Sequence, residues 1–396
     1  MNLLVYFVLY YTVIYMMNAV YGTYLPVYFN SIGLSATQIG TLLSLGPLVA
    51  ILGQPLWGTV SDKASAKNTV LRLLLIGTGL SVLLFTVSHQ FVYLLVVICL
   101  FTFFQTSILP ISDAITLEEV DKRKGWSFGT IRMGGTIGFA VMSLAFGMVA
   151  KHDITLMFAV IAGVLAVSLA LMHKFPKVAG YQLTGRKMQV WVLFRNRKLL
   201  LYLGICFSIH VSLGFYYSFF PVFYKEMGAD SVLLGWSMVI SSLGEVPFLL
   251  FFQKIVQRFS IRLILLGAGI AASCRWIVFY FIHDPYLVLP VQLLHGLTFI
   301  VVSVTLATYI NREVPKELKA SGQTLNGWLN LGIARVAGSF LGGIASDAFG
   351  MRNVFLYSAI FGLLSIVAFA FASAWMDRMG QPAMDASRSA SGGGPI

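Results

Sequence analysis

Long apolar runs alternate with short polar connections along the whole chain. Most runs contain about 20 residues or more, which is enough for a helix to cross the hydrocarbon core of a bilayer. The twelve runs lie at 3–29, 37–59, 69–88, 91–117, 128–150, 154–174, 199–223, 231–253, 262–281, 286–310, 321–346 and 351–375. This pattern predicts an all-α membrane protein with twelve transmembrane helices. The first run has no basic segment before it, so we expect a retained helix rather than a signal peptide.

The composition agrees with this fold class. Of the 396 residues, 58% are hydrophobic and 11% are charged, whereas soluble domains have about 25% charged residues. Cys99, Cys206 and Cys274 all fall inside apolar runs, so neither a disulfide nor a metal site is expected. The chain also lacks the HExxH, GxSxG and glycine-rich phosphate-binding motifs. We therefore expect no enzyme activity, no cofactor and no metal.

Basic residues are distributed unevenly between the two sides of the predicted membrane domain. Of the 27 Lys and Arg residues, the candidate residues Arg132, Arg275 and Arg335 lie inside runs, and Lys151, Lys225 and Arg352 lie in or directly beside the connections that follow odd-numbered runs. The remaining 21 lie in the other connections, at the ends of the runs that adjoin them, or at the termini. Because Lys and Arg accumulate in cytoplasmic loops, both termini of this multi-pass cell-membrane protein are expected to be cytoplasmic. The asymmetry accounts for the net charge of +12, and no nucleic-acid partner is needed to explain it.

The chain divides near its middle. The longest connection, 175–198, separates six runs from six, so we predict a first bundle at 1–174 and a second at 199–376, followed by a disordered tail at 377–396. The pattern GxxRxxG occurs around Arg132 in the fifth run and around Arg335 in the eleventh, with an offset of 203 residues. Equivalent positions in two six-helix units indicate a duplicated architecture.

The connection after the second run reads "GQPLWGTVSDKASAK" and contains Gly58, Asp62 and Lys63. It resembles the signature loop of the major facilitator superfamily, which implies two six-helix bundles around a central cavity. In that family the loop implies a conformational latch, in which the carboxylate contacts a neighbouring helix on the closed cytoplasmic side. An ordinary polar helix end is the alternative interpretation.

Two segments resemble the oligosaccharide and proton symporters of the lactose permease type. These are "QPLWGTVSDK" and, on the fifth run, "FGTIRMGGTIGF". The resemblance implies that Arg132 binds sugar hydroxyls and that Asp113 is the neighbouring carboxylate, if one residue is inserted between them. It also places Phe139 where those symporters stack an aromatic ring on the sugar.

The resemblance continues in the second half of the chain. Glu245 in "LGEVPF", Arg275 in "SCRWIVF" and His295 in "LLHGLTF" match a Glu, an Arg and a His of the same symporters, and also segments of the phenylpropionate permease branch. It implies that all three contact the substrate and take part in proton coupling. Thr298 stands where the lactose permease group has its proton-carrying glutamate, so Glu245 becomes the expected proton carrier.

The free-energy cost of placing a charge in the bilayer also points to these residues as candidates. A charged side chain at the bilayer centre costs roughly 2.5–3.5 kcal/mol on insertion scales, so it must be paired or hydrated. The alternatives to a functional role are structural ion pairs, Asp113 with Arg132 and Glu245 with Arg275. His295, His210, Tyr216 and Tyr217 could be packing residues. Arg335 remains a cavity charge of unknown role, and the excess of one positive charge among the intramembrane residues suits an anionic substrate.

These features predict a secondary transporter. The leading expectation is a monomer that imports a small polar solute, a sugar or glycoside, by alternating access with H⁺ as the coupling ion. Aromatic carboxylates held by Arg275 or Arg335, nucleosides, and drug efflux by proton antiport are alternative functions. A sensor that binds without transport is a further alternative from outside this class.

Overall fold

The computed structural model describes residues 3–180, 193–315 and 318–391, and the described residues form helices joined by short connections. The first half contains α1 (Leu3–Ser31), α2 (Ala36–Lys63), α3 (Lys67–Leu83), η1 (Leu84–Thr86), α4 (Phe91–Gln105), α5 (Ile108–Asp121), α6 (Phe128–Ala150) and α7 (Leu156–Met172). The second half contains α9 (Arg197–Glu226), α10 (Ser231–Arg258), α11 (Ile261–Phe281), η2 (Pro285–Leu287), α12 (Val288–Gln292), α13 (His295–Glu313), α14 (Lys319–Asn326), η4 (Gly327–Ile333), α15 (Ala334–Phe349) and α16 (Met351–Ser391). The predicted all-α membrane fold is confirmed.

Eleven helical segments in the described residues are long and apolar enough to span a membrane. The predicted sixth run, 154–174, corresponds to the shorter helix α7, whose 17 residues extend about 26 Å at 1.5 Å per residue. At the other end of the chain, α16 remains helical to Ser391. The predicted disordered tail at 377–396 extends beyond the described residues, which end at Ser391, and stays a prediction. Most of the central connection, 181–192, lies outside the described residues.

The fourth predicted run is interrupted, and its sequence explains the break. It forms two helices, α4 and α5, with Thr106 and Ser107 between them. Pro110 has no backbone N–H to donate to the carbonyl of Thr106, four residues earlier. That carbonyl instead accepts a hydrogen bond from the side-chain amide of Gln54 on α2, at 3.2 Å. The break therefore ties the fourth span to the second.

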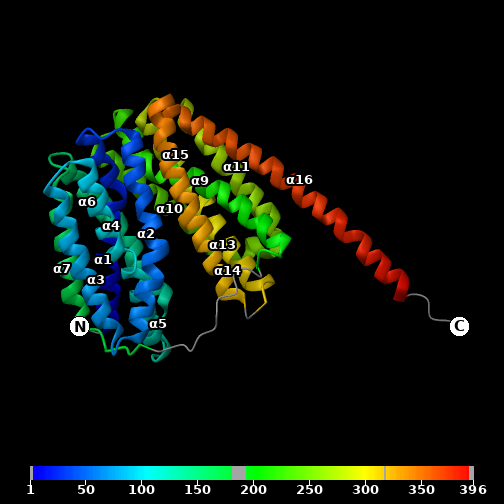
Figure 1. Ribbon diagram of the computed structural model, residues 1–396, viewed down its shortest axis with the longest axis horizontal. Coiled ribbons are helices and arrows are strands. Elements are labelled where there is room, and N and C mark those ends of the chain that lie inside the picture. The colour runs from blue at the N-terminus through cyan, green and yellow to red at the C-terminus, as the bar shows by residue number, and fades with distance from the viewer. Residues whose placement is uncertain (1–2, 181–192, 316–317, 392–396) are drawn as a thin grey trace.

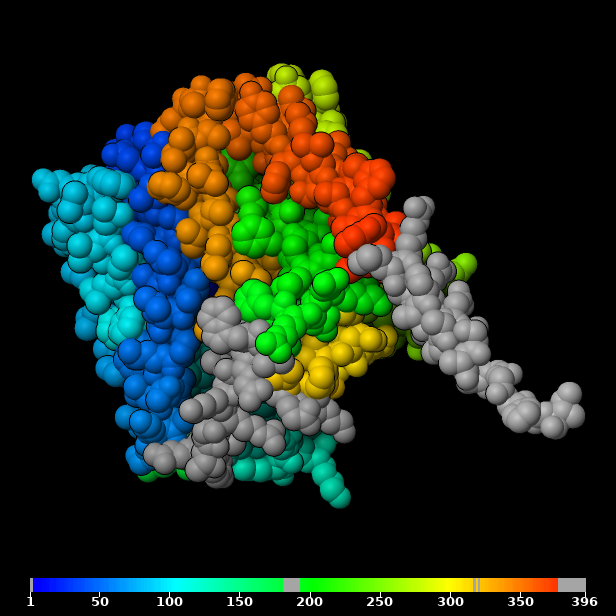
Figure 2. Space-filling model, turned by 45° about the vertical axis from the view of Figure 1, so that its right-hand side comes forward, coloured from blue at the N-terminus to red at the C-terminus, as the bar shows by residue number. Residues whose placement is uncertain are grey.

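The two halves meet at one end of the molecule and diverge toward the end at which the N-terminus lies (Figure 1). Helix α2 packs on α15, α6 packs on α10, and α1 contacts α9. We call the end that contains Ala36 and Phe349 the closed end and the opposite end the open end. In Figure 2 the α15 surface lies directly against α2 over the part nearer the closed end.

Small residues bring the backbones of the two halves together. A Cβ on Gly40 of α2 would collide with the carbonyl of Ser339 on α15, and one on Gly235 of α10 would collide with the carbonyl of Ser143 on α6. The close approach at these two positions requires glycine, and small residues in general are typical of membrane helix contacts. Within each half the repeat also positions a glycine. Gly135 packs against α1, and its counterpart Gly338 packs against α9.

The two copies of the repeat differ by one residue. Gly125 and Trp126 precede the first GxxRxxG pattern, in which Gly129 follows Gly125 by four positions, whereas Gly332 follows Gly327 by five. The second copy forms a π-helix, η4, over Gly327–Ile333. A π-helix has i→i+5 hydrogen bonds, so it accommodates an extra residue without interrupting the helix. Arg335 follows this segment by two positions.

Candidate transport site

The first-half candidates form a hydrogen-bonded pair. Arg132 of α6 donates from Nη1 to Oδ2 of Asp113 on α5, at 3.1 Å. Tyr11 of α1 donates to the other carboxylate oxygen of Asp113, at 2.6 Å. The guanidinium carbon of Arg132 also lies 5.8 Å from the centre of the Phe128 ring. Three helices of the first bundle therefore contribute to one site.

This pair is accessible as well as bonded. The side chain of Arg132 is 49% exposed and that of Asp113 is 25% exposed, so both retain free donor or acceptor capacity. A guanidinium paired with a carboxylate presents donors and acceptors together, which suits vicinal hydroxyl groups. Phe139 lies on the same helix, partly buried, and its predicted stacking on a sugar ring stays a prediction.

The second-half candidates gather in a buried cluster between α9, α11 and the break between α12 and α13. Arg275, which is 0% exposed, donates from Nη2 to Oε1 of Gln292, and its Nη1 lies 3.1 Å from Nδ1 of His295. Its guanidinium carbon lies 4.2 Å from the ring centre of Tyr216. Arg275 is thus enclosed by protein groups, and its predicted contact with substrate stays a prediction.

The contact with Arg275 fixes the tautomer of His295. A guanidinium only donates hydrogen bonds, so Nδ1 of His295 must accept, and the proton of the neutral ring is on Nε2. Nε2 faces the hydroxyl of Tyr217 at 3.0 Å and Oε1 of Glu245 at 3.8 Å. The side chain of Glu245 is 27% exposed. Glu245 reaches Arg275 through His295, and the direct ion pair considered from the sequence is not formed.

Two glycines explain how Glu245 and His295 come together. Each lies beside a glycine in the sequence, Gly244 and Gly296. A Cβ on Gly296 would collide with the backbone of Gly244, and one on Gly244 would collide with the backbone of Leu293. Helices α10 and α13 therefore approach to backbone contact at this point. The side chains next to the two glycines are consequently brought within reach of each other.

A cavity of about 310 Å³ lies between the two halves. Its polar lining comes from both of them. Tyr21, Thr102, Gln105 and Thr106 belong to the first half, and Tyr217, Ser218, Arg335 and Ser339 belong to the second. A second cavity, of about 580 Å³, lies between α2 and the α14–η4 segment and shares Pro47, Ala50 and Leu331 with the first. We call the first the central cavity.

Arg335 is the charged residue in the lining of the central cavity. Its guanidinium carbon lies 4.7 Å from the ring centre of Tyr217 and 5.7 Å from that of Phe299. Its Nε is buried without a hydrogen-bond partner. Among the described residues no carboxylate pairs with it. It therefore differs from Arg132 and Arg275, which are both hydrogen-bonded to side chains.

Gly58, Asp62 and Lys63 lie near the end of α2, and the side chains of Asp62 and Lys63 are exposed at the open end. Their role as a latch stays a prediction.

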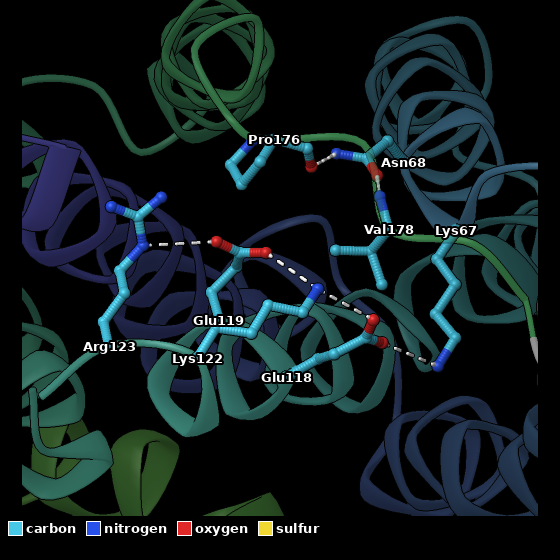
Figure 3. Close-up of polar contacts among 8 residues, drawn as sticks. All are labelled: Lys67, Asn68, Glu118, Glu119, Lys122, Arg123, Pro176 and Val178. Carbon is cyan, nitrogen blue, oxygen red and sulfur yellow. Dashed lines mark hydrogen bonds and ion pairs between the residues drawn. The ribbon is translucent and has the colours of Figure 1, made fainter.

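Nearby, a network of ion pairs links α5 to α3 at the open end. It contains Glu118, Glu119, Lys122 and Arg123, and Lys67 extends it to α3 (Figure 3). Hydrogen bonds to Glu118 and Glu119 raise the pKa of Lys122. Asn68 bonds the backbone of Pro176 and Val178, which fixes the start of the central connection (Figure 3).

Sequence reasoning missed three residues of these clusters. Tyr11 and Gln292 were not selected, and Tyr217 was expected to be a packing residue, yet each hydrogen-bonds a candidate side chain. Polar aromatic and amide residues are common in membrane helices, so their identity alone gives no signal. His210 bonds the carbonyl of Cys206 within its own helix, which agrees with a packing role.

Comparisons with known proteins identify the family. The model of the MFS_1 like family matches residues 2–357. The uncharacterized transporter YwbF of Bacillus subtilis is 26% identical over 342 residues, covering 85% of this chain and 84% of that protein. Maltose permease of Geobacillus stearothermophilus is 25% identical over 343 residues, covering 84% and 85%. The crystal structure of the nucleoside transporter NupG superposes with a TM-score of 0.84 at 17% identity, over 93% of this chain and 98% of that one.

These findings confirm the resemblance to major facilitator transporters, together with the predicted fold and the expectation that the chain is not an enzyme. The family match, over residues 2–357, includes each of the candidate residues from Gly58 to Arg335. A multi-pass membrane protein with this fold moves small molecules across the bilayer as a secondary transporter. The chain belongs to the MFS_1 like family of transporters.

Proposed function

We propose that this transporter imports a sugar or glycoside together with protons. The observation that carries the coupling is the environment of Glu245. Its carboxylate contacts His295, and among the described residues it pairs with neither Lys nor Arg. A carboxylate with a neutral imidazole neighbour can take up and release a proton as its access alternates, whereas the carboxylate of Asp113 is engaged by the guanidinium of Arg132.

The sugar class is supported by the pair in the first half. Arg132 and Asp113 are bonded to each other and remain partly exposed, which is the arrangement that recognises neighbouring hydroxyls. The similarity to a maltose permease agrees with this substrate class. Phe139 is the proposed stacking residue.

The direction of opening follows from the proposed topology. With both termini in the cytoplasm, the open end faces the cytoplasm and the closed end faces outward. The conformation is then inward-open, and the exposed side chain of Asp62 is released from the latch. Transport requires the halves to rock about the central cavity, so that the contacts at the closed end separate while the open end closes.

Substrate-induced proton movement in proteoliposomes tests this function. Galactosides, glucosides, nucleosides and aromatic acids are added to the wild type, to Glu245→Gln and to Glu313→Gln, which alters an exposed carboxylate at the end of α13. We expect one glycoside class to alkalinise the outer solution with the wild type and Glu313→Gln, and Glu245→Gln to exchange the solute without moving protons. Exchange without proton movement in the wild type would show that the protein is a facilitator and would exclude Glu245 as the carrier.

A further inference from the structure

Three arginines of the membrane-spanning helices are candidate site residues, Arg132, Arg275 and Arg335, and they have different surroundings. Arg132 is bonded to Asp113, and Arg275 is bonded to Gln292 and His295. Arg335 has two aromatic rings beside it but no hydrogen bond or ion pair in the described part of the chain. Because an uncompensated charge at membrane depth is costly, an anion that reaches Arg335 gains a large part of its binding energy there.

The position of Arg335 connects such an anion to transport, because a solute carried between the two halves has to occupy the cavity between them. The residue lines the central cavity, at the contact of the two halves. No Asp or Glu is found among the described residues that line this cavity or the adjoining one. The positive charge is therefore presented to whatever occupies the cavity, with no acidic side chain in the lining to neutralise it.

The other polar groups of the central cavity are neutral. Gln105, Thr102 and Thr106 supply amide and hydroxyl groups from the first half, and Ser218 and Ser339, which bond each other, supply hydroxyls from the second. The ring of Tyr217 lies beneath the guanidinium. A planar guanidinium binds a carboxylate through two parallel hydrogen bonds, while neutral donors and acceptors match sugar hydroxyls.

We propose that Arg335 binds a carboxylate of the transported solute, so that the substrate is an acidic glycoside, such as a glycoside of a uronic acid, rather than a neutral one. This rests on the proposed import of glycosides and names the substrate class. The carboxylate pairs with Arg335 in the central cavity, beside its neutral amide and hydroxyl groups, while Arg132 and Asp113 remain the proposed partners of the sugar hydroxyls. The interaction uses both planar donors of arginine, so lysine is a poor replacement.

A matched pair of substrates tests the proposal. 4-Nitrophenyl β-D-glucuronide and 4-nitrophenyl β-D-glucoside differ at one carbon, which is a carboxylate in the first and a hydroxymethyl in the second. Both are given to the wild type, Arg335→Lys and Arg335→Gln in proteoliposomes, with 3-phenylpropionate as a third probe. Uptake and apparent affinity are measured, and thermal unfolding shows whether each variant is folded.

We expect the wild type to prefer the glucuronide by at least about tenfold, as expected for a lost charge-assisted bond of roughly 1.5–3 kcal/mol. Arg335→Gln is expected to lower glucuronide uptake at least about tenfold more than glucoside uptake and so to remove this preference, and Arg335→Lys is expected to retain only part of it. A wild type that prefers the glucoside overturns the proposal, whatever the variants do. An equal loss of both substrates in folded Arg335→Gln also overturns it.

The third probe separates the two proposals. Uptake of 3-phenylpropionate that depends on Arg335, without uptake of either glycoside, would support the carboxylate site and exclude glycoside import. Uptake of the glucoside with proton movement, insensitive to Arg335, would support glycoside import and exclude the carboxylate site.

Discussion

The hydroxyl of Tyr217 lies 3.0 Å from Nε2 of His295. The same tyrosine places its ring against the guanidinium of Arg335 in the central cavity. One side chain therefore contacts both the proposed anion site and the histidine that adjoins Glu245. If Glu245 carries the proton as proposed, this contact links the central cavity to the proton site, and a substitution that removes one oxygen atom tests the link.

Tyr217→Phe keeps the ring and removes the hydroxyl. We expect solute exchange to remain within about threefold of the wild type, because the ring still packs on Arg335. Proton movement per solute is expected to fall by at least about tenfold, since His295 loses a partner and its ring is less well oriented toward Glu245. Parallel measurements of exchange and of proton flux check this. An equal decrease in both would assign Tyr217 to packing.

Arg132→Lys preserves the charge on α6 and removes the planar donors. We expect uptake to fall by about 100-fold or more, because a single ammonium cannot bond Asp113 and two sugar hydroxyls in the same geometry. Initial uptake rates across a range of glycoside concentrations check this. Retention of both affinity and rate would leave Arg132 as a structural partner of Asp113 only.

Gly296→Ala introduces a methyl group where α13 touches the backbone of Gly244. We expect the helices to separate, with a loss of roughly 1–3 kcal/mol in stability and a loss of proton coupling as His295 moves away from Glu245. Gly267→Ala on α11 is the control, because its added methyl group would meet open space. Thermal unfolding and proton flux of both variants distinguish the site-specific effect from a general sensitivity to alanine.

Asp347 joins the halves at the closed end. From α15 it accepts hydrogen bonds from the backbone N–H groups of Ala36, at 3.0 Å, and Thr37, at 2.8 Å, at the start of α2. Asp347→Asn removes the charge and one acceptor, so we expect the closed end to open roughly 2- to 30-fold more often, from cap energies of 0.5–2 kcal/mol.

Spin labels at positions 89 and 283, in connections at the closed end of each half, measure the distance between the halves. Asp284→Asn is the matched control, because Asp284 caps a helix of its own half through Tyr286. A distance distribution for Asp347→Asn that coincides with those of the control and the wild type would show that the cap does not hold the halves together.

Asp230 gives a prediction for pH. The hydrogen bond from the backbone N–H of Leu233, with a smaller contribution from Lys151, lowers the pKa of this carboxyl. Its stabilising effect is therefore complete above the ordinary carboxyl pKa of about 3.9 and is lost as the pH falls through the lowered value. The difference in unfolding temperature between wild type and Asp230→Ala should be constant from pH 5 to 8 and shrink below pH 4. A difference that changes near pH 6 would contradict this assignment.

The hydrophobic pattern was sufficient for the helices, because membrane spans are set by length and apolarity. The site was only partly predictable. The pairing of Asp113 with Arg132 was considered correctly, since both lie on adjacent spans. The alternative of a structural ion pair between Glu245 and Arg275 is not found, because the backbone contact between Gly244 and Gly296 directs Glu245 to His295 instead. Such contacts depend on how two helices cross, which no pattern within one helix records.

The interrupted helices show a second limit. Pro110 was visible in the sequence, but the acceptance of a Gln54 hydrogen bond by the freed carbonyl depends on the position of α2. The π-helix η4 required a comparison of the two repeats residue by residue, because its sequence is not unusual by itself. Local sequence predicted where helices run, and only the assembled structure determines where they are tied together.

The single residue added in η4 has a consequence for the symmetry of the transporter. The Gly-Trp pair of the second copy lies within η4, where Gly327 and Trp328 line the second cavity, whereas Gly125 and Trp126 of the first copy precede α6. With identical copies, the two halves would have the same backbone structure on both sides of the cavity. The two halves therefore differ in backbone structure next to their equivalent arginines, Arg132 and Arg335, although both carry the same GxxRxxG pattern.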